Sequence, residues 1–282
     1  MRRCTRLVSR RVDALAQIDG WPAPHAAVAV IGRDGALAQR GDGARLFRWA
    51  SITKLLTALA ALVAAEEGTI DLDQPAGPEG STVRHLLAHT SGLAFDTGPP
   101  LSRPGRRRIY SNTGFEVLAD AIGRATEMPF ERYLRSAVVE PLGLGGELRG
   151  SAASGFHGDL ADLVALAREL LAPTLLAPET LVEATTVVFP GLDGVLPDLG
   201  RMQPNDWGLG FEVRDGKSPH WTGLRNSPST FGHFGGSGTF LWVDPERVLA
   251  LVCLTDLEFG EWAKEAWPRL SDAVLEDAAQ SA

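Results

Sequence analysis

Ser51 and Lys54 open the most chemically suggestive segment of the sequence, "SITKLL". They stand three residues apart at the start of an apolar helix predicted over residues 51–67, so their side chains project from one face. A serine hydroxyl becomes a nucleophile beside a base, and a lysine shielded from water can supply the neutral amine required. A first-turn position also leaves the Ser51 N–H available to an oxyanion. The alternative is that Ser51 only caps the helix.

Tyr110 and Asn112 form a second candidate pair in "YSN", between a Pro-Gly turn and a predicted helix. A tyrosine can act as a general base if neighbouring cations lower its pKa, and an asparagine can both donate to and accept from a substrate amide. The alternative is a buried tyrosine followed by a helix cap. The basic run 106–108 is either a solvated loop face or a cationic rim that lowers the tyrosine pKa.

His233 lies in "GHFGGSGTF", on a predicted strand before a glycine-rich turn that includes Gly235 and Gly236. Glycines in a strand mark places where a ligand or another backbone approaches closely. A half-buried strand histidine and an ordinary hairpin turn are the alternatives.

Two further pairs carry weaker signals. His85 and His89 have the i, i+4 spacing of metal ligands on a helix, but no third ligand is evident, so we expect packing and capping roles. Trp207 and Trp221 either line a pocket or fill the core. We predict no metal and no cofactor.

Composition narrows the function classes. The chain has 282 residues, a net charge of −8 and two cysteines. The acidic balance disfavours nucleic acid as a partner, and the sparse cysteines suit a reducing compartment. The apolar run 55–65 is too short to span a membrane. The N-terminus lacks an apolar signal-peptide core, so we expect a cytoplasmic protein. The oligomeric state is left open.

The order of predicted elements indicates an α+β fold. One antiparallel sheet assembles from both ends of the chain, helices at the two termini cover one face, and a helical insert lies beside the other. We expect one catalytic domain, 1–282, with an α/β sandwich subdomain formed by 1–66 plus 205–282 and a helical insert at 67–204. The predicted elements are a helix at 5–18, a hairpin within 25–41, the helix 51–67 ending at Gly68, helices between 81 and 175, a long loop at 186–206, strands at 207–213, 231–235 and 239–256, and a helix at 261–279.

Ser-x-x-Lys, Tyr-x-Asn and His-x-Gly, in this order on helix, loop and strand, resemble the serine β-lactamase and penicillin-binding-protein superfamily. The similarity is closest to its class C branch, which also holds D-Ala-D-Ala carboxypeptidases, D-aminopeptidases and esterases. It extends over roughly residues 25–256 and includes "TVRHLLAHTSGL", "WGLGF" and "TFLWVDPERVLALVCLTD". The resemblance implies the α/β sandwich with a helical subdomain.

The resemblance also implies roles for individual residues. Ser51 would be the acylated nucleophile, Lys54 its base and proton shuttle, and Tyr110 a partner base. Asn112 would bind the substrate amide and Lys54. The backbone N–H groups of Ser51 and Gly236 would form the oxyanion hole.

Three departures from the family pattern matter. His233 stands where many relatives carry lysine, and a mostly neutral histidine binds a carboxylate weakly, which implies an esterase or amidase rather than an efficient β-lactamase. Only 59 positions separate Ser51 from Tyr110, so the insert is trimmed and the site more open. No export signal is evident, which makes cell-wall peptidoglycan an awkward substrate. In addition, no Glu-x-x-Leu-Asn stretch is present, so the class A deacylation device has no counterpart.

The sequence therefore predicts a hydrolase that cleaves a small-molecule ester, amide or β-lactam through an acyl-enzyme on Ser51. A D-amino-acid peptidase or weak β-lactamase is one alternative, and transfer of the acyl group to an acceptor other than water is another. A non-catalytic binding protein of the same fold is the rival from a different class.

Overall fold

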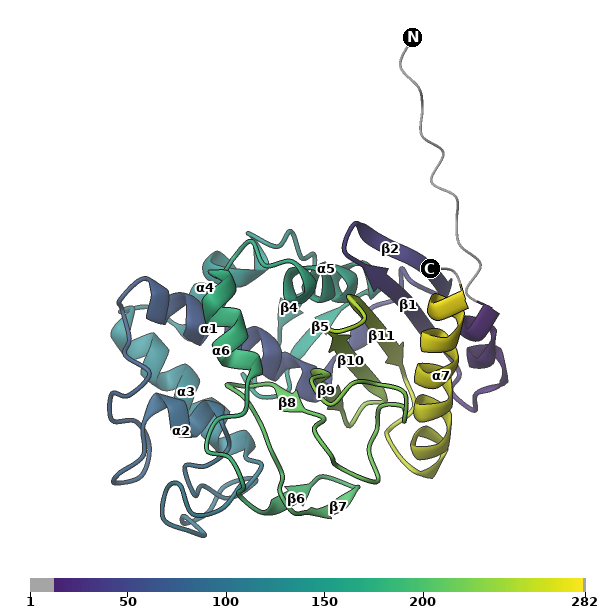
Figure 1. The fold of residues 1–282 in the computed structure, drawn as a ribbon. Coiled ribbons are helices and arrows are strands. Elements are labelled where there is room, and N and C mark those ends of the chain that lie inside the picture. Colours follow the sequence, from purple (N-terminus) through teal and green to yellow (C-terminus); the bar gives the residue numbers. More distant parts are fainter. Residues whose placement is uncertain (1–12, 281–282) are drawn as a thin grey trace.

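A six-stranded antiparallel sheet forms the centre of the computed structural model, which describes residues 13–280 (Figure 1). Its first strand pairs with its last, with Ala26 opposite Thr255, which confirms that both ends of the chain build one sheet. In the sheet order β2-β1-β11-β10-β9-β8, the strands are Gly35–Gly41, Ala26–Gly32, Leu249–Thr255, Thr239–Asp244, Phe231–Gly235 and Glu212–Val213.

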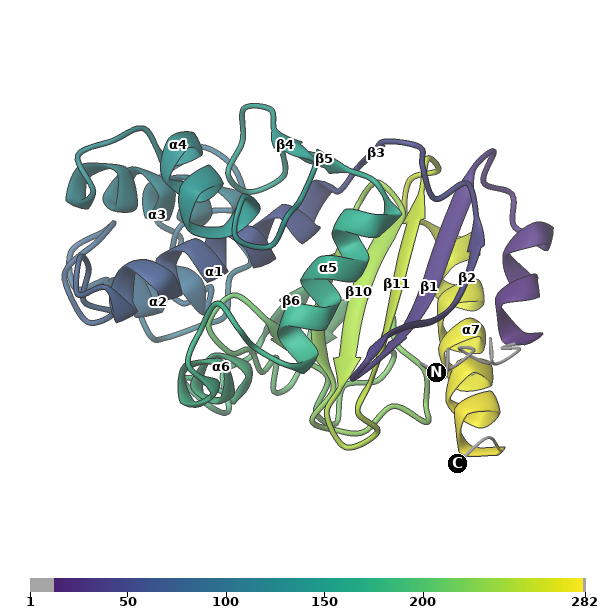
Figure 2. The same cartoon turned by 90° about the horizontal axis from the view of Figure 1, so that it is seen from above.

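Helices cover both faces of this sheet. Alternate residues of a strand point to opposite faces, and Val28 of β1 packs with α7 (Glu261–Gln280), whereas Ala29 belongs to the core on the other side. A 3₁₀ helix, Asp13–Gly20, lies beside α7 (Figure 2). The predicted N-terminal helix falls partly outside the described residues. These observations confirm the α+β class.

The other face of the sheet is covered by α5 (Leu160–Leu171), which contacts β1 and β11. By sequence, α5 belongs to the expected insert 67–204, yet it packs on the sheet and separates the sheet from the remaining helices (Figure 2). The division into subdomains stays a prediction.

The remaining helices pack around α1 (Thr53–Glu66), whose residues 53–64 are all buried. Gly68 follows it with a φ of 73°, as a helix-ending glycine does, so the predicted buried helix is confirmed. It contacts α3 (Asn112–Ala125) and α4 (Phe130–Leu134), which continues into a π-helical turn, Arg135–Val139, while α2 (Val83–Leu87) packs against α3. Within residues 13–280, no helix has the length and hydrophobicity needed to cross a bilayer.

Several short elements differ from the sequence-based expectations. The predicted loop 186–206 contains a hairpin, β6 (Gly194–Leu196) and β7 (Gly200–Met202), and α6 (Pro178–Thr185) was not expected. A second small sheet, unexpected because its strands are so short, joins β3 (Phe47–Arg48), β5 (Phe156–Gly158) and β4 (Glu147–Leu148).

The predicted strand 207–213 was mostly wrong, since only β8 at its end is a strand. A Cβ on Gly208 would overlap the Ala184 carbonyl, and one on Gly210 would overlap the Ala58 side chain. The glycines therefore serve close approach of this segment to α6 and α1, not strand pairing.

Candidate active site

Ser51 sits in a strained turn at the junction between the sheet and the helices. A 3₁₀ turn, Ala50–Ile52, precedes α1, and Ala50 has a φ of 45°, which a non-glycine residue adopts only when its surroundings enforce it. Strand β9 packs against this turn. A Cβ on Gly235 would overlap the carbonyl oxygen of Trp49, so glycine is required for β9 to approach the turn that carries Ser51.

The start of α1 is held by the backbone of residues 152–156. The Thr53 hydroxyl oxygen accepts from the Phe156 N–H at 3.0 Å, and the Thr57 hydroxyl donates to the Ala152 carbonyl at 2.7 Å. The Lys54 ammonium nitrogen lies 2.9 Å from the Ala153 carbonyl oxygen. The polar side chains of the otherwise apolar helix α1 thus hold residues 152–156 against the start of the helix, next to Ser51.

Lys54 is completely buried, and its three neighbours fix its orientation. Its Nζ lies 2.7 Å from Asn112 Oδ1, 2.9 Å from the Ala153 carbonyl oxygen and 3.3 Å from Ser51 Oγ. Burial lowers the pKa of Lys54 to about 7, against the opposing effect of the Glu116 and Asp96 carboxylates. A neutral amine has two N–H groups, and here they donate to Asn112 Oδ1 and to the Ala153 carbonyl oxygen. The lone pair of the amine is therefore left to face the Ser51 hydroxyl.

Glu116 holds the loop that supplies the Ala153 carbonyl. Its carboxylate accepts from the Ser151 hydroxyl and from the backbone N–H groups of Ala152 and Ala153, the last two at 3.3 and 3.2 Å. Asn112 and Glu116 stand at i, i+4 on α3 and therefore share a face. The sequence analysis missed both Glu116 and the Ala153 carbonyl; the i, i+4 spacing from Asn112 was the one available signal.

Tyr110 and His233 meet on the other side of Ser51. Tyr110 Oη lies 3.4 Å from His233 Nε2, while His233 Nδ1 lies 2.6 Å from the Phe234 carbonyl oxygen. A carbonyl only accepts, so Nδ1 carries the proton and Nε2 accepts from the tyrosine hydroxyl. Burial, with a contribution from Lys54, lowers the pKa of His233 to about 3, so the ring is neutral.

Burial raises the pKa of Tyr110 and outweighs the opposite effect of its hydrogen bond with Ser51. This direction favours Lys54 over Tyr110 as the group that deprotonates Ser51. Tyr110 instead keeps its proton, and its hydroxyl stands between Ser51 and His233.

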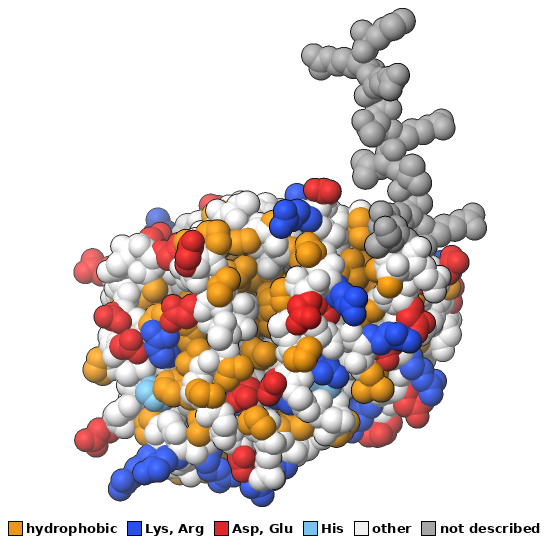
Figure 3. Space-filling model, viewed as in Figure 1, with side chains coloured by type: hydrophobic (Ala, Val, Ile, Leu, Met, Phe, Trp, Pro, Cys, Tyr) orange, Lys and Arg blue, Asp and Glu red, His pale blue; other side chains and the backbone are white. Residues whose placement is uncertain are grey.

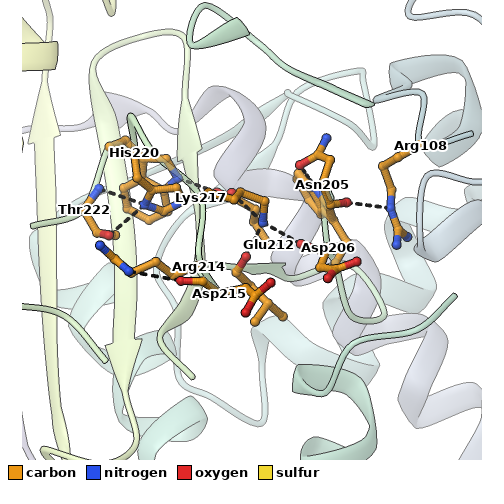
Figure 4. Close-up of polar contacts among 12 residues, drawn as sticks. Arg108, Asn205, Asp206, Glu212, Arg214, Asp215, Lys217, His220 and Thr222 are labelled. Carbon is orange, nitrogen blue, oxygen red and sulfur yellow. Dashed lines mark hydrogen bonds and ion pairs between the residues drawn. The ribbon is translucent and has the colours of Figure 1, made fainter. Parts of the chain in front are cut away.

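Arg108 takes a role that neither sequence-based alternative anticipated. Its guanidinium is buried and donates to the carbonyl oxygen of Asn205 at 2.9 Å (Figure 4), and also to those of Ala88 at 2.5 Å and Val188 at 2.9 Å. Burial lowers the pKa of Arg108 to about 10. The Arg108 side chain is thus neither exposed to solvent nor part of a cationic rim. Its hydrogen bonds connect residues 186–206 to the segment that precedes Tyr110.

A second buried polar cluster lies behind β8 (Figure 4). One Glu212 oxygen lies 3.2 Å from Lys217 Nζ and 2.9 Å from His220 Nε2, and the other accepts from the Trp221 indole. Burial pushes the pKa of Glu212 upward, but His220 and Lys217 outweigh it and hold that pKa at about 2. Trp221 therefore belongs to the core of the segment that leads into β9.

Ser51 borders two cavities of opposite character. A polar one of about 620 Å³ runs outward past Asn112 and Gly236. A smaller, mostly apolar chamber of about 100 Å³ lies beside Tyr110, Trp207 and His233, so Trp207 is a pocket residue.

The oxyanion hole formed by the backbone N–H groups of Ser51 and Gly236 stays a prediction. Outside the helices and strands of residues 13–280, no backbone hydrogen bond has either N–H as its donor, and both residues line the two cavities. The space around the Gly236 Cα is open.

The histidines of "HLLAH" do not share a helix face, because α2 ends at Leu87 and His89 follows with a φ of 55°. His85 bonds to Thr82 Oγ1 at 2.8 Å, and His89 accepts from the Ser111 N–H at 3.1 Å. Within the described part of the chain, no cluster of three His, Cys, Asp or Glu side chains is arranged to hold a metal ion.

The fold, with these side chains gathered around Ser51, is typical of a class of serine hydrolases. Comparison with known proteins identifies the family. A family model described as Beta-lactamase matches residues 18–275. The chain therefore belongs to the β-lactamase family.

Known structures agree with this assignment. A crystal structure of a β-lactamase from Mycobacterium bovis is 57% identical, with a TM-score of 0.93 over 94% of this chain and 99% of that one. EstCE1, described as a hydrolase with promiscuous acyltransferase activity, has a TM-score of 0.77 and 18% identity over 95% of this chain and 98% of its own. At that identity the likeness shows the fold alone.

A curated relative from Salmonella paratyphi B, named as a D-alanyl-D-alanine carboxypeptidase, is 26% identical over 197 residues. The match covers 54% of this chain but only 46% of that protein. The chain thus spans about half the length of the curated relative that it matches.

Proposed function

We propose that this chain is a serine hydrolase that cleaves an ester or amide bond of a small molecule through an acyl-enzyme on Ser51. The observation that carries the proposal is the placement of Lys54. Its amine is buried, has a pKa of about 7, and is held by two carbonyl oxygens so that its third direction faces the Ser51 hydroxyl. A lysine in that state is a base suited to neutral pH.

The reaction begins when Ser51 Oγ attacks the substrate carbonyl carbon and Lys54 takes its proton. The N–H groups of Ser51 and Gly236 bind the oxyanion. Tyr110 hands its proton to the departing oxygen or nitrogen and recovers one from Lys54, whose Nζ lies 4.8 Å from the centre of the tyrosine ring. Water then attacks the ester carbonyl and gives a proton to Lys54, which passes it to Ser51 Oγ as the bond between Oγ and the acyl carbon breaks.

Neutral substrates are favoured over those that carry a carboxylate, such as β-lactams and D-amino-acid peptides. His233 is neutral, and the described residues that line the chamber at Ser51 include Asp198 but no lysine or arginine; Arg45 and Arg48 line only the larger, polar cavity. These observations support esterase or amidase chemistry over the alternatives that the sequence left open. A reducing, cytoplasmic setting is part of the proposal, supported by the buried, unpaired Cys253.

Mass spectrometry of the intact protein tests the proposal. Brief exposure to a fluorophosphonate and to p-nitrophenyl butyrate should add the phosphonyl and butyryl masses, peptide mapping should place both on Ser51, and Ser51→Ala should show neither. Penicillin should label more slowly than the butyrate ester. A folded protein that none of the three reagents modifies would be a binding protein, not an acyl-transfer enzyme.

A further inference from the structure

A second apolar cavity, of about 380 Å³, opens next to the chamber at Ser51. Phe95, Tyr110 and Pro197 line both cavities, so the two share a wall. Leu101 and Val195 continue the apolar lining outward. An apolar surface thus leads from the nucleophile to the exterior; we call this second cavity the Val195 groove. Its volume lies within the range of about 300–1,000 Å³ that is typical of ligand pockets.

The walls of this groove expose large hydrophobic side chains to water. Phe95 is 48% exposed, Leu101 62% and Val195 55%. Hydrophobic side chains occupy much of the middle of the face shown in Figure 3. Apolar groups gathered around a concavity, and not scattered singly, mark a binding site.

The two walls come from separate segments that are held in a fixed relation. Arg108 pairs with Gly194 through an isolated parallel bridge, and the Arg108 N–H donates to the Asp193 carbonyl oxygen at 2.9 Å. A Cβ on Gly194 would overlap the Arg108 carbonyl. The β6–β7 hairpin that carries Val195 is therefore fastened to the segment that leads into Tyr110, and the groove is preformed.

In the proposed reaction Tyr110 hands a proton to the departing atom, so the leaving group faces Tyr110, which also lines the Val195 groove. Asn112 lines the polar 620 Å³ cavity and does not line the groove. The two portions of a substrate therefore meet surfaces of opposite polarity.

We propose that the Val195 groove binds an apolar alkyl or aryl group on the leaving side of the scissile bond, so that the substrates are esters of hydrophobic alcohols. Among the described residues that line the groove, there are two arginines and no acidic side chain. Arg108 is committed to backbone carbonyls, and Arg107 lies at the rim. The inner surface of the groove consequently has no carboxylate to pair with a cationic substrate group and no free cation to pair with an anionic one.

The inference rests on the proposed serine hydrolase function, and the test separates the two. Acetate esters of linear alcohols from ethanol to octanol form one series, and ethyl esters of linear acids from acetate to octanoate form the other. In the alcohol series kcat/KM should rise by about fourfold for each of the first few methylenes. In the acyl series no such rise is expected, because the acyl group faces the polar cavity.

Val195→Asp tests the groove directly, with Val182→Asp as its matched control. Val182 is 64% exposed on α6 and does not line the groove. A carboxylate inside the groove should reduce the gain in the alcohol series to less than about twofold per methylene, whereas Val182→Asp should keep the wild-type slope. Competitive inhibition by 1-octanol relative to ethanol gives a readout that does not depend on turnover, and it should weaken in Val195→Asp alone.

The outcomes distinguish a failure of the groove proposal from a failure of the proposed serine hydrolase function. Hydrolysis with a flat alcohol series, or an equal slope in Val195→Asp and wild type, overturns the groove proposal and leaves the hydrolase intact. A rise in kcat/KM only in the acyl series would place the hydrophobic group on the acyl side of the scissile bond and would also overturn the groove proposal. No hydrolysis of any ester, with no label on Ser51, overturns the proposed function itself.

Discussion

Replacing Lys54 with methionine removes a group whose pKa the fold lowers to about 7. The unfolded chain keeps the ordinary lysine pKa of about 10.4. Between pH 7 and about 10.4 the unfolded state therefore binds more protons than the native state, so the stability that this group contributes rises with pH over that window. Below pH 7 the native protein carries the full penalty of a buried ammonium. The methionine variant, which does not titrate, lacks this pH dependence.

The size of the effect follows from the two pKa values. The slope approaches about 1.4 kcal/mol per pH unit where the lysine is neutral in the native state and charged in the unfolded state. Integration from pH 7, where half of the native molecules are protonated, to pH 9 gives the wild type a gain of about 2 kcal/mol over Lys54→Met. The hydrogen bonds lost to Asn112 and Ala153 destabilise the variant equally at every pH and cancel in this comparison.

Denaturant unfolding of both proteins at pH 6, 7, 8 and 9 measures this gain. Ser51→Ala is the control, since it keeps Lys54 and should follow the pH dependence of the wild type. In parallel, kcat/KM for p-nitrophenyl butyrate should fall about tenfold per pH unit below 7, as the neutral amine disappears. A difference in stability between wild type and Lys54→Met that stays constant from pH 6 to 9 would refute the lowered pKa and with it the assignment of Lys54 as the base.

Three other substitutions test the surroundings of the site. Glu116→Gln removes a charge that raises the Lys54 pKa, so the acid limb of the kcat/KM profile should move to lower pH; an unchanged limb would contradict the electrostatic link. Gly235→Ala should destabilise the protein by about 1–3 kcal/mol, because its Cβ overlaps the Trp49 carbonyl; Gly236→Ala, with open space at that position, is the control for unfolding measurements and should be neutral. Arg108→Lys leaves carbonyls without their donors and should lower stability by about 2–4 kcal/mol, whereas Arg107→Lys on the exposed neighbour should not; equal effects would mean that the buried guanidinium does not hold the loop.

The candidate site was predictable as far as side chains in short motifs could reveal it. Ser51 and Lys54 share a helix face by spacing alone, and the glycines after His233 indicated close approach of a backbone. The structure brings these residues together with Tyr110 and Asn112, as the predicted set requires.

The remaining parts of the site depend on tertiary contacts that no local pattern encodes. The backbone carbonyl that orients Lys54 belongs to Ala153, and an alanine side chain in the sequence does not indicate such a role. Glu116 acts by holding the loop that contains Ala153. Arg108 reads as part of an exposed basic run, because its carbonyl partners come from segments distant in sequence. In the same way, the strands of two or three residues near Phe156 are too short to produce a periodic pattern.

The pairing of β1 with β11 also constrains how the chain folds during synthesis. Strand β1 ends at Gly32 and its partner begins at Leu249, so an emerging chain must extend by roughly 200 residues, about 10–40 s of translation, before this pair can form. The contacts of α1 with α3 and α4 are available much earlier. Ser51 and Lys54 therefore leave the ribosome long before β9 can bring His233 and Gly236 to them, so a nascent chain carries the proposed nucleophile and base before the proposed oxyanion hole can form.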